Sequence, residues 1–481
     1  MAYSRRHILQ SWVAALGTVA IPTHAAAQSR SAQEQVTARL DKLAPSGQTV
    51  VHAVDLTTGV AVASIGAQRM LPMASVAKSF SACWALDQLG EAFQFETQLR
   101  SSAPVINGRL AGHVRIEGVG DPVFNTDALQ NLVDQLKARG ISALEGGLSV
   151  GTSSFGTIHE IDPTQPDHVQ YNPAVCGMNL NLNRAQFTWK STSEGYDLGF
   201  VTPSNLGDVP TRALRAQLSP RNSPVFEYHG PTDGRELWSV AQSALGEGGR
   251  RWLPVRRPTD YAADVFQSVL TRSKLSHALR LGPSDVAHPN VLARHRSAPL
   301  AEIVRDMMKY STNLTAEMLM LRSAAHGGGA PQTLGAGAQS MQMWLAREFG
   351  LRQLRLENGS GLSDRNRTSA QDLVRFFGSS KTAKSLAPLL KTIPIDRVEG
   401  DRGQGRLNVR AKTGTLNFVS ALSGYILDDQ DRPIAFAIMS ADEAARDAVP
   451  AYKRDNPDGG KAWLNRARYM QREVIRAITA A

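Results

Sequence analysis

Met73-Ala74-Ser75-Val76-Ala77-Lys78 places a serine hydroxyl and a lysine amine three residues apart, where a helical pattern begins. The pattern predicts a helix from Ser75 to Leu89 that ends before Gly90. Positions three apart share one helix face, so the two side chains meet in the first turn. A serine hydroxyl becomes a strong nucleophile when an adjacent base takes its proton. The stretch therefore predicts Ser75 as a nucleophile and Lys78 as its base; the alternative is that Ser75 only caps the helix.

A second lysine stands in Lys412-Thr413-Gly414. The flanking apolar runs predict strands at residues 407–410 and 421–427, so Lys412 lies near a strand end. A fixed ammonium there can hold the terminal carboxylate of a peptide, a charge-assisted contact of about 1.5–3 kcal/mol. Its charge would also favour the uncharged form of Lys78 that a base requires. A solvated lysine before a turn is the alternative.

The residues that follow Lys412 complete a predicted peptide site. Gly414 allows a substrate backbone to approach the strand edge closely, and Thr413 and Thr415 are expected to bind substrate. The backbone N–H groups of Ser75 and Thr415 are predicted to form an oxyanion hole.

A third motif, Ser311-Thr312-Asn313, lies between Tyr310 and the apolar helical run 314–321. Ser311 can bridge Lys78 and a leaving amine as a proton relay, and Asn313 can orient Lys78 and a substrate amide. These residues are also a good helix-capping sequence, which is the alternative.

The three motifs, in this order and with this long gap between Ser75 and Ser311, resemble the D-alanyl-D-alanine carboxypeptidase/endopeptidase family of penicillin-binding protein 4. Gly118-Val119-Gly120-Asp121-Pro122 and Asn358-Gly359-Ser360-Gly361-Leu362-Ser363 are similar to two further segments of that family. One departure concerns recognition of the substrate side chain: the family usually has Arg directly after Gly-Leu-Ser, whereas here Asp364 precedes Arg365.

The resemblance implies an α/β (α+β) fold, in which a penicillin-binding transpeptidase-like domain, an antiparallel sheet flanked by helices, carries a large β-rich insertion. It implies a serine-type D-alanyl-D-alanine carboxypeptidase or endopeptidase that acts on peptidoglycan stem peptides through an acyl-enzyme on Ser75 and is inhibited by β-lactams. A β-lactamase-like hydrolase and a non-catalytic peptidoglycan-binding protein are the alternatives. Residues 28–97 and 291–481 are expected to form the split catalytic domain, and residues 98–290 an insertion of two domains.

The N-terminus has the features of an export signal. Arg5-Arg6 precedes an apolar run at residues 12–21, and Ala25-Ala26-Ala27 offers a cleavage site. We therefore expect residues 1–27 to be a twin-arginine signal peptide and the mature protein to be periplasmic. A membrane anchor is the alternative, although the run is shorter than the roughly 20 residues that span a bilayer.

The composition of the chain limits the kinds of binding partner and cofactor that we expect. The net charge of +10 suits attraction to anionic polymers or lipid head groups, but no basic stripe with aromatics predicts nucleic acid binding. No Cys/His cluster has metal-ligand spacing and no cofactor motif is visible, so we expect neither metal nor cofactor. Two cysteines, Cys83 and Cys176, are too few for a disulfide scaffold. A basic amphipathic helix at residues 461–478 is expected to pack against the sheet, with peripheral membrane association as the alternative.

Overall fold

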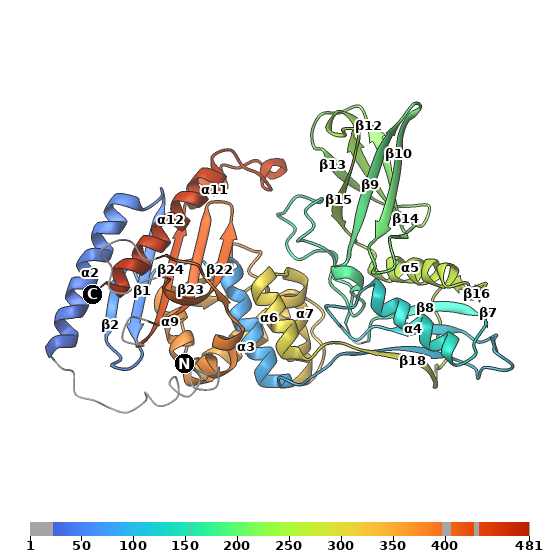
Figure 1. Cartoon of the computed structure of the whole chain (residues 1–481), viewed down its shortest axis with the longest axis horizontal. Coiled ribbons are helices and arrows are strands. Elements are labelled where there is room, and N and C mark those ends of the chain that lie inside the picture. Colours follow the sequence, from blue (N-terminus) through green and yellow to red (C-terminus); the bar gives the residue numbers. More distant parts are fainter. Residues whose placement is uncertain (1–22, 154, 397–405, 428–431, 481) are drawn as a thin grey trace. The chain divides into compact units, whose positions relative to one another are not determined.

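The computed structural model describes residues 23–153, 155–396, 406–427 and 432–480, with side chains from residue 31 onward. The chain forms two compact units (Figure 1). Unit 1 holds residues 1–90, 304–316 and 334–481, and unit 2 holds residues 91–303 and 317–333. Most of the signal peptide expected at residues 1–27 lies outside the described residues, and the first helix among the described residues, α2, runs over Thr23–Leu43.

Unit 1 is built on a six-stranded antiparallel sheet in the order β2-β1-β24-β23-β22-β21. The two central strands consist almost wholly of apolar and small residues, and both are buried along nearly their whole length, which explains why they lie inside the sheet. The strands are β1 (Gln48–Asp55), β2 (Ala61–Ile65), β21 (Lys391–Thr392), β22 (Asn408–Leu416), β23 (Val419–Leu427) and β24 (Pro433–Ala441).

Helices α2 and α12 (Gly460–Thr479) cover one face of this sheet (Figure 1). The predicted apolar stripe of the last helix is buried, and Met470, Val474 and Ile478 join one core with Val409 and Ala411 of β22. Burying such a side chain contributes about 1.5–3 kcal/mol. The stripe that would lie on a membrane is therefore used to close the sheet. No helix in the described part of the chain is long and apolar enough to cross a membrane.

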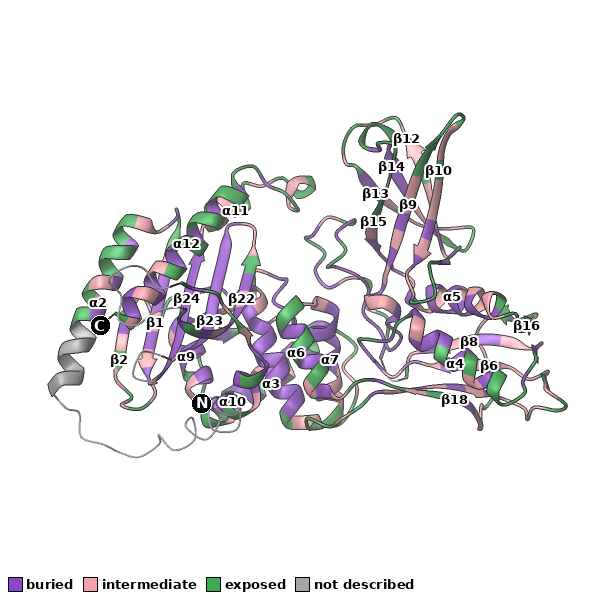
Figure 2. Cartoon of the chain, viewed as in Figure 1, coloured by how far each residue is buried: buried purple, intermediate pink, exposed green. Residues whose placement is uncertain are grey.

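Further helices complete unit 1, and their inward faces are buried while their outward faces are exposed (Figure 2). Phe376 of α9 packs edge to face on Phe80 of α3, which fixes these two helices against each other. A small three-stranded sheet, β19-β20-β3, lies beside them. These elements are β3 (Met70–Pro72), η1 (Ala74–Ala77), α3 (Lys78–Leu89), α8 (Leu334–Phe349), β19 (Leu354–Arg355), β20 (Arg367–Ser369), α9 (Ala370–Gly378), α10 (Ser380–Leu386), η4 (Ala387–Leu389), α11 (Glu443–Asp447) and η5 (Ala451–Lys453).

Two helices carry the chain between the units, α6 (Leu300–Tyr310) and α7 (Asn313–His326). Residues 304–316, which include the end of α6 and the start of α7, belong to unit 1. The third predicted motif falls in this short segment.

Unit 2 is rich in β-structure and has its own apolar core. Its sheets have the orders β17-β8-β6-β4-β18, β11-β10-β9-β15, β12-β14-β13 and β16-β7-β5. The strands are β4 (Glu96–Ser101), β5 (Arg109–Leu110), β6 (Val114–Glu117), β7 (Ala143–Leu144), β8 (Gly147–Gly151), β9 (Arg184–Thr192), β10 (Gly195–Thr202), β11 (Val209–Pro210), β12 (Leu214–Ser219), β13 (Phe226–Thr232), β14 (Arg235–Ala241), β15 (Gly248–Pro254), β16 (Ser276–His277), β17 (Arg280–Leu281) and β18 (Asn290–Arg296). The helices are α4 (Thr126–Ala138), η2 (Leu180–Leu182), η3 (Gln242–Ala244) and α5 (Pro258–Arg272).

The boundaries expected for the insertion, at residues 97/98 and 290/291, fall within β4 and β18. These two strands pair with each other, so each boundary would cut through one sheet of unit 2. The contacts instead divide the chain after Gly90 and before Val304.

Candidate active site

Lys78 is the first residue of α3, and its side chain is 0 % exposed. Its Nζ lies 2.8 Å from Ser75 Oγ, 2.7 Å from Asn313 Oδ1 and 2.8 Å from the carbonyl oxygen of Ser360. A buried amine needs hydrogen-bond partners, and these three supply them. The structure thus brings together the first and third predicted motifs around one lysine.

Ser75 lies in the 3₁₀ helix η1, not in the first turn of the α-helix as predicted. The α-helix starts only at Lys78, and Ala77, which precedes it, makes no side-chain capping bond. Ala74, directly before Ser75, has a φ of 47°, a left-handed conformation that alanine rarely adopts. Such strain costs on the order of 1–3 kcal/mol and is common at active sites. The sequence pattern located the helix but did not reveal this strained turn at its start.

Ser311 connects α6 to α7 and also has a left-handed backbone, with a φ of 61°. Its N–H donates to the carbonyl of Met307 at 2.8 Å, which ends α6. Asn313 begins α7 and accepts a hydrogen bond from Lys78. The motif therefore forms a tight corner between two helices and also places Asn313 against the buried amine.

Lys412 lies on β22 and is likewise 0 % exposed. Its Nζ donates to Ser311 Oγ at 3.0 Å and to the carbonyl of Thr413 at 2.8 Å. Burial holds the pKa of Lys412 well below its ordinary value, and the like charges of Lys78 and Lys391 lower it further. Without an anion beside it, Lys412 is therefore held toward its uncharged form, and a carboxylate bound next to it would favour the charged form.

Glycines allow the segments around Ser75 to approach each other. A Cβ on Gly414 would lie 2.6 Å from the carbonyl oxygen of Met73 and 3.1 Å from the nitrogen of Ser75. Gly414 is therefore needed for packing of β22 against η1, in addition to the predicted access for substrate. This packing also brings the N–H of Ser75 close to the strand segment that carries Thr415.

The loop at residues 358–363 is part of the site, although the sequence indicated it only as a segment similar to the family. The carbonyl of Ser360 accepts from Lys78, and the carbonyl of Gly359 accepts from Ser81 Oγ at 2.7 Å. Every residue has a backbone carbonyl, so the sequence cannot show which carbonyl accepts a hydrogen bond from Lys78. Only the run of Gly and Ser residues indicated that other segments can pack closely against this loop.

Changing Gly361 to alanine is expected to disrupt this packing, because its Cβ would lie 1.9 Å from the carbonyl oxygen of Ala74. Gly59 is a matched control: its φ of 73° is close to the 76° of Gly361, but nothing lies within 4 Å of its Cβ. Chemical denaturation should show that Gly361→Ala lowers the free energy of unfolding by about 1–3 kcal/mol more than Gly59→Ala does. Equal losses would mean that backbone conformation, and not the contact with η1, makes Gly361 necessary.

Asp364 and Arg365, where this sequence departs from the family after Gly-Leu-Ser, form two different ion pairs. Asp364 pairs with Arg446 of α11 at 2.7 Å, and Arg446 also donates to the carbonyl of Asn417 at 3.1 Å. Arg365 pairs instead with Glu357 at 2.8 Å. Asp364 thus ties the turn after β22 to the Gly-Ser loop through Arg446.

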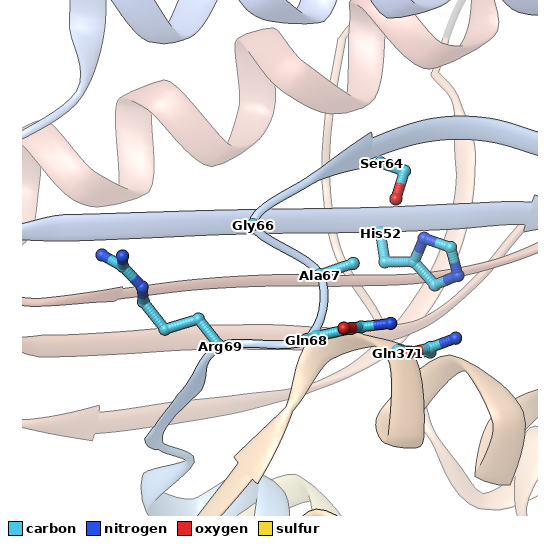
Figure 3. Close-up of a pocket in the computed structure, with 7 residues that line it drawn as sticks. All are labelled: His52, Ser64, Gly66, Ala67, Gln68, Arg69 and Gln371. Carbon is cyan, nitrogen blue, oxygen red and sulfur yellow. The ribbon is translucent and has the colours of Figure 1, made fainter.

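A separate shallow cavity of about 350 Å³ lies over the outer strands of the sheet. Figure 3 shows that its lining side chains of His52, Gln68 and Gln371 point to one side and Arg69 points away. It contains none of the predicted site residues. Burial lowers the pKa of His52. Within the described ranges, no group of three His, Cys, Asp or Glu side chains is arranged to hold a metal ion.

Both cysteines are free thiols in buried positions. Burial raises the pKa of Cys83 and of Cys176 to about 12 in each case. A buried thiol with a raised pKa is not set up as a thiolate nucleophile.

Comparison with known proteins identifies the family of this chain. Residues 32–461 match the D-Ala-D-Ala carboxypeptidase 3 (S13) family. The D-alanyl-D-alanine carboxypeptidase of Actinomadura sp. is 26% identical over 422 residues, covering 81% of this chain and 77% of that protein. The D-alanyl-D-alanine carboxypeptidase DacB of Haemophilus influenzae is 25% identical over 420 residues, covering 82% of this chain and 85% of that protein.

The fold is also similar to that of a solved structure. The crystal structure of penicillin binding protein 4 from Haemophilus influenzae matches with a TM-score of 0.71 and 22% identity, covering 92% of this chain and 98% of that one. The predicted fold class, a transpeptidase-like domain with a large insertion, is confirmed. The family match covers most of the chain, so the chain belongs to the D-Ala-D-Ala carboxypeptidase 3 (S13) family. This is the family of serine peptidases that the three motifs predicted.

Proposed function

We propose that the protein is a serine-type D-alanyl-D-alanine carboxypeptidase that acts on peptidoglycan stem peptides through an acyl-enzyme on Ser75, with β-lactams as inhibitors. One observation carries the proposal: the buried Lys78 Nζ lies 2.8 Å from Ser75 Oγ. The names of the similar proteins and the family support the same reaction. The related penicillin binding protein 4 of Haemophilus influenzae has been crystallised with a β-lactam.

The hydrogen-bond partners of Lys78 suit a base. Two of the oxygens around its Nζ, Asn313 Oδ1 and the Ser360 carbonyl, can only accept hydrogen bonds, whereas the Ser75 hydroxyl can also donate. An uncharged amine has two N–H donors and one lone pair. The two acceptors take the N–H groups, so the lone pair points at the Ser75 proton. The amine can then remove that proton as Oγ attacks the carbonyl carbon of the penultimate D-alanine.

The other motifs would stabilise the negative charges of the substrate and the intermediate, and would protonate the leaving group. The N–H groups of Ser75 and Thr415 would stabilise the oxyanion of the tetrahedral intermediate. Lys412 would hold the terminal carboxylate. Ser311, which accepts a hydrogen bond from Lys412, would relay the proton that Lys78 took from Ser75 to the departing amine as the C–N bond breaks. Water then hydrolyses the ester on Ser75. The same steps would cleave a peptide cross-link, in which the leaving amine belongs to a second stem peptide.

The proposed location follows from the sequence. The twin arginines and the apolar run before Ala27 support export to the periplasm, where the cell-wall substrate is found. Peripheral attraction to the membrane surface would fit the basic net charge.

Mass spectrometry after incubation with benzylpenicillin tests the proposal. The wild type should gain the mass of the drug on Ser75, and Ser75→Ala should gain none. The wild type should also release D-alanine from diacetyl-L-lysyl-D-alanyl-D-alanine. Rapid turnover of the drug without a lasting adduct would instead indicate a β-lactamase, and neither adduct nor release would indicate a non-catalytic binding protein.

A further inference from the structure

The expected oxyanion hole takes its two N–H groups from two strained segments. Ser75 follows Ala74, which has a left-handed backbone. Thr415 lies at the end of β22, just before the turn into β23. In that turn Phe418 has a φ of 56°, which a bulky side chain rarely adopts. Strained backbone persists where surrounding contacts hold it, so both halves of the hole depend on support from other segments.

The chain that follows β24 supplies this support to the β22–β23 turn. The N–H of Asp442 donates to the carbonyl of Phe418 at 2.9 Å, and Arg446 Nη1 donates to the carbonyl of Asn417 at 3.1 Å. The Phe418 ring also packs edge to face on Trp463 of α12. Both carbonyls of the turn are thus bonded to the start of α11 and its N-cap residue.

The same short helix is bonded to the segment that supports Ser75. Glu443 pairs with Arg367 through both carboxylate oxygens, at 2.9 and 2.7 Å. Arg367 donates in turn to the carbonyl of Met70 at 3.0 Å, and its strand β20 pairs with β3. Strand β3 leads into η1, which carries the nucleophile. Helix α11 therefore contacts both halves of the expected oxyanion hole.

Arg446 makes the most direct connection between these halves. Its side chain is 11 % exposed, and its Nε pairs with Asp364 at 2.7 Å while its Nη1 bonds the Asn417 carbonyl. Two residues after Asp364, the carbonyl of Asn366 accepts from the N–H of Met73 at 3.1 Å. A guanidinium is planar and rigid, so one group bonded at two sides fixes the separation of the segments that it joins.

We propose that Arg446 is a positioning residue that sets the spacing of the oxyanion hole, by holding Asp364 on the Ser75 side to Asn417 on the Thr415 side. The inference rests on the proposed function. Both N–H groups must reach the same oxygen, and a displacement of about 1 Å can cost roughly a hundredfold in rate. The family usually has arginine in place of Asp364, and an arginine there would repel Arg446, so this link is particular to this chain.

The test measures acylation by benzylpenicillin over a range of drug concentrations, which separates binding from the bond-forming step. Arg446→Met should lower the limiting acylation rate about 10- to 100-fold, with little change in the dissociation constant of the complex before acylation. The ester carbonyl of the penicilloyl-enzyme should absorb at a higher infrared frequency than in the wild type, because weaker hydrogen bonds polarise it less.

Asp364→Asn breaks the same link at a more exposed position, so it tests the proposal even if Arg446→Met fails to fold. It should slow acylation and raise the carbonyl frequency in the same direction. The double variant should be no slower than Arg446→Met, because the two residues act through one contact. Effects that multiply in the double variant would mean that Asp364 acts independently of Arg446, and would overturn the inference.

Arg476→Met is the matched control. Arg476 is 17 % exposed, pairs with Glu473 and donates to the carbonyl of Asp396 at 2.8 Å, near the end of β22 that is opposite Thr415. It loses the same kinds of bond and the same charge, yet it should keep the wild-type acylation rate and carbonyl frequency.

Two further results would overturn the inference: a folded Arg446→Met with the wild-type rate and frequency, or an Arg476→Met that is slowed as much as Arg446→Met. Both would leave the proposed function intact. A wild type that forms no adduct would instead overturn the proposed function itself.

Discussion

Replacing Lys78 with methionine is expected to slow acylation of Ser75 by penicillin on the order of 10²–10⁴-fold, the usual contribution of a general base. Lys78 Nζ is the group 2.8 Å from the attacking oxygen, and methionine has similar length but no lone pair aimed at the proton. Stopped-flow measurement of the acylation rate checks this. Methionine should fill the buried space, so the fold should persist in thermal unfolding.

Lys384→Met provides the control for the loss of one lysine, because Lys384 is exposed on α10, away from the predicted site. It should acylate at the wild-type rate. If Lys78→Met acylated within tenfold of the wild type while folded, Lys78 would not be the base, and the mechanism proposed for Ser75 would be wrong.

Replacing Lys412 with methionine is expected to lower kcat/KM and, at neutral pH, to raise the free energy of unfolding. A charge-assisted contact with the substrate carboxylate is worth about 1.5–3 kcal/mol, so kcat/KM for a D-alanyl-D-alanine peptide should fall by about 10- to 150-fold. The loss should be much smaller for the same peptide with an amidated C-terminus, which has no carboxylate to bind. An equal loss for both peptides would assign Lys412 to another role.

The stability effect follows from the depressed pKa of Lys412. The folded protein binds this proton less tightly than the unfolded chain, whose lysine titrates near 10.5. The unfolded state therefore holds more protons between the lowered pKa and 10.5, and the free energy of unfolding of the wild type should rise with pH in that window. Below the lowered pKa the penalty is complete. Lys412→Met should thus be more stable than the wild type at neutral pH, and its advantage should shrink as the pH approaches 10.5.

Urea denaturation of both proteins at several pH values measures this difference. A wild type that is more stable than Lys412→Met at neutral pH would mean that the bonds to Ser311 and Thr413 outweigh the burial of the charge. A positive result would show that the site is kept at a cost in stability, as is common for functional residues.

Much of the local structure was predictable because it depends on neighbours in the sequence. The helix predicted at residues 461–478 is α12, which extends one residue further at each end, and the helix predicted after Ser75 ends at Leu89, as α3 does. Apolar periodicity and glycine or proline at the ends carry that information. The start of α3 was misjudged because packing of Gly414 and Gly361 against residues 73–74 imposes a 3₁₀ turn there. That packing is made by segments far away in the chain.

The sequence by itself determined which groups can react: a serine three residues before a lysine, two further motifs in order, and the family to which they belong. Only the tertiary structure decided that Lys78 and Lys412 are both fully buried and that the carbonyl of Ser360 accepts a hydrogen bond from Lys78. The physical reason is that charge state and reactivity depend on solvent exclusion and on neighbours in space. Those neighbours come from segments that are far apart in the sequence, and local sequence patterns do not show which of these segments meet.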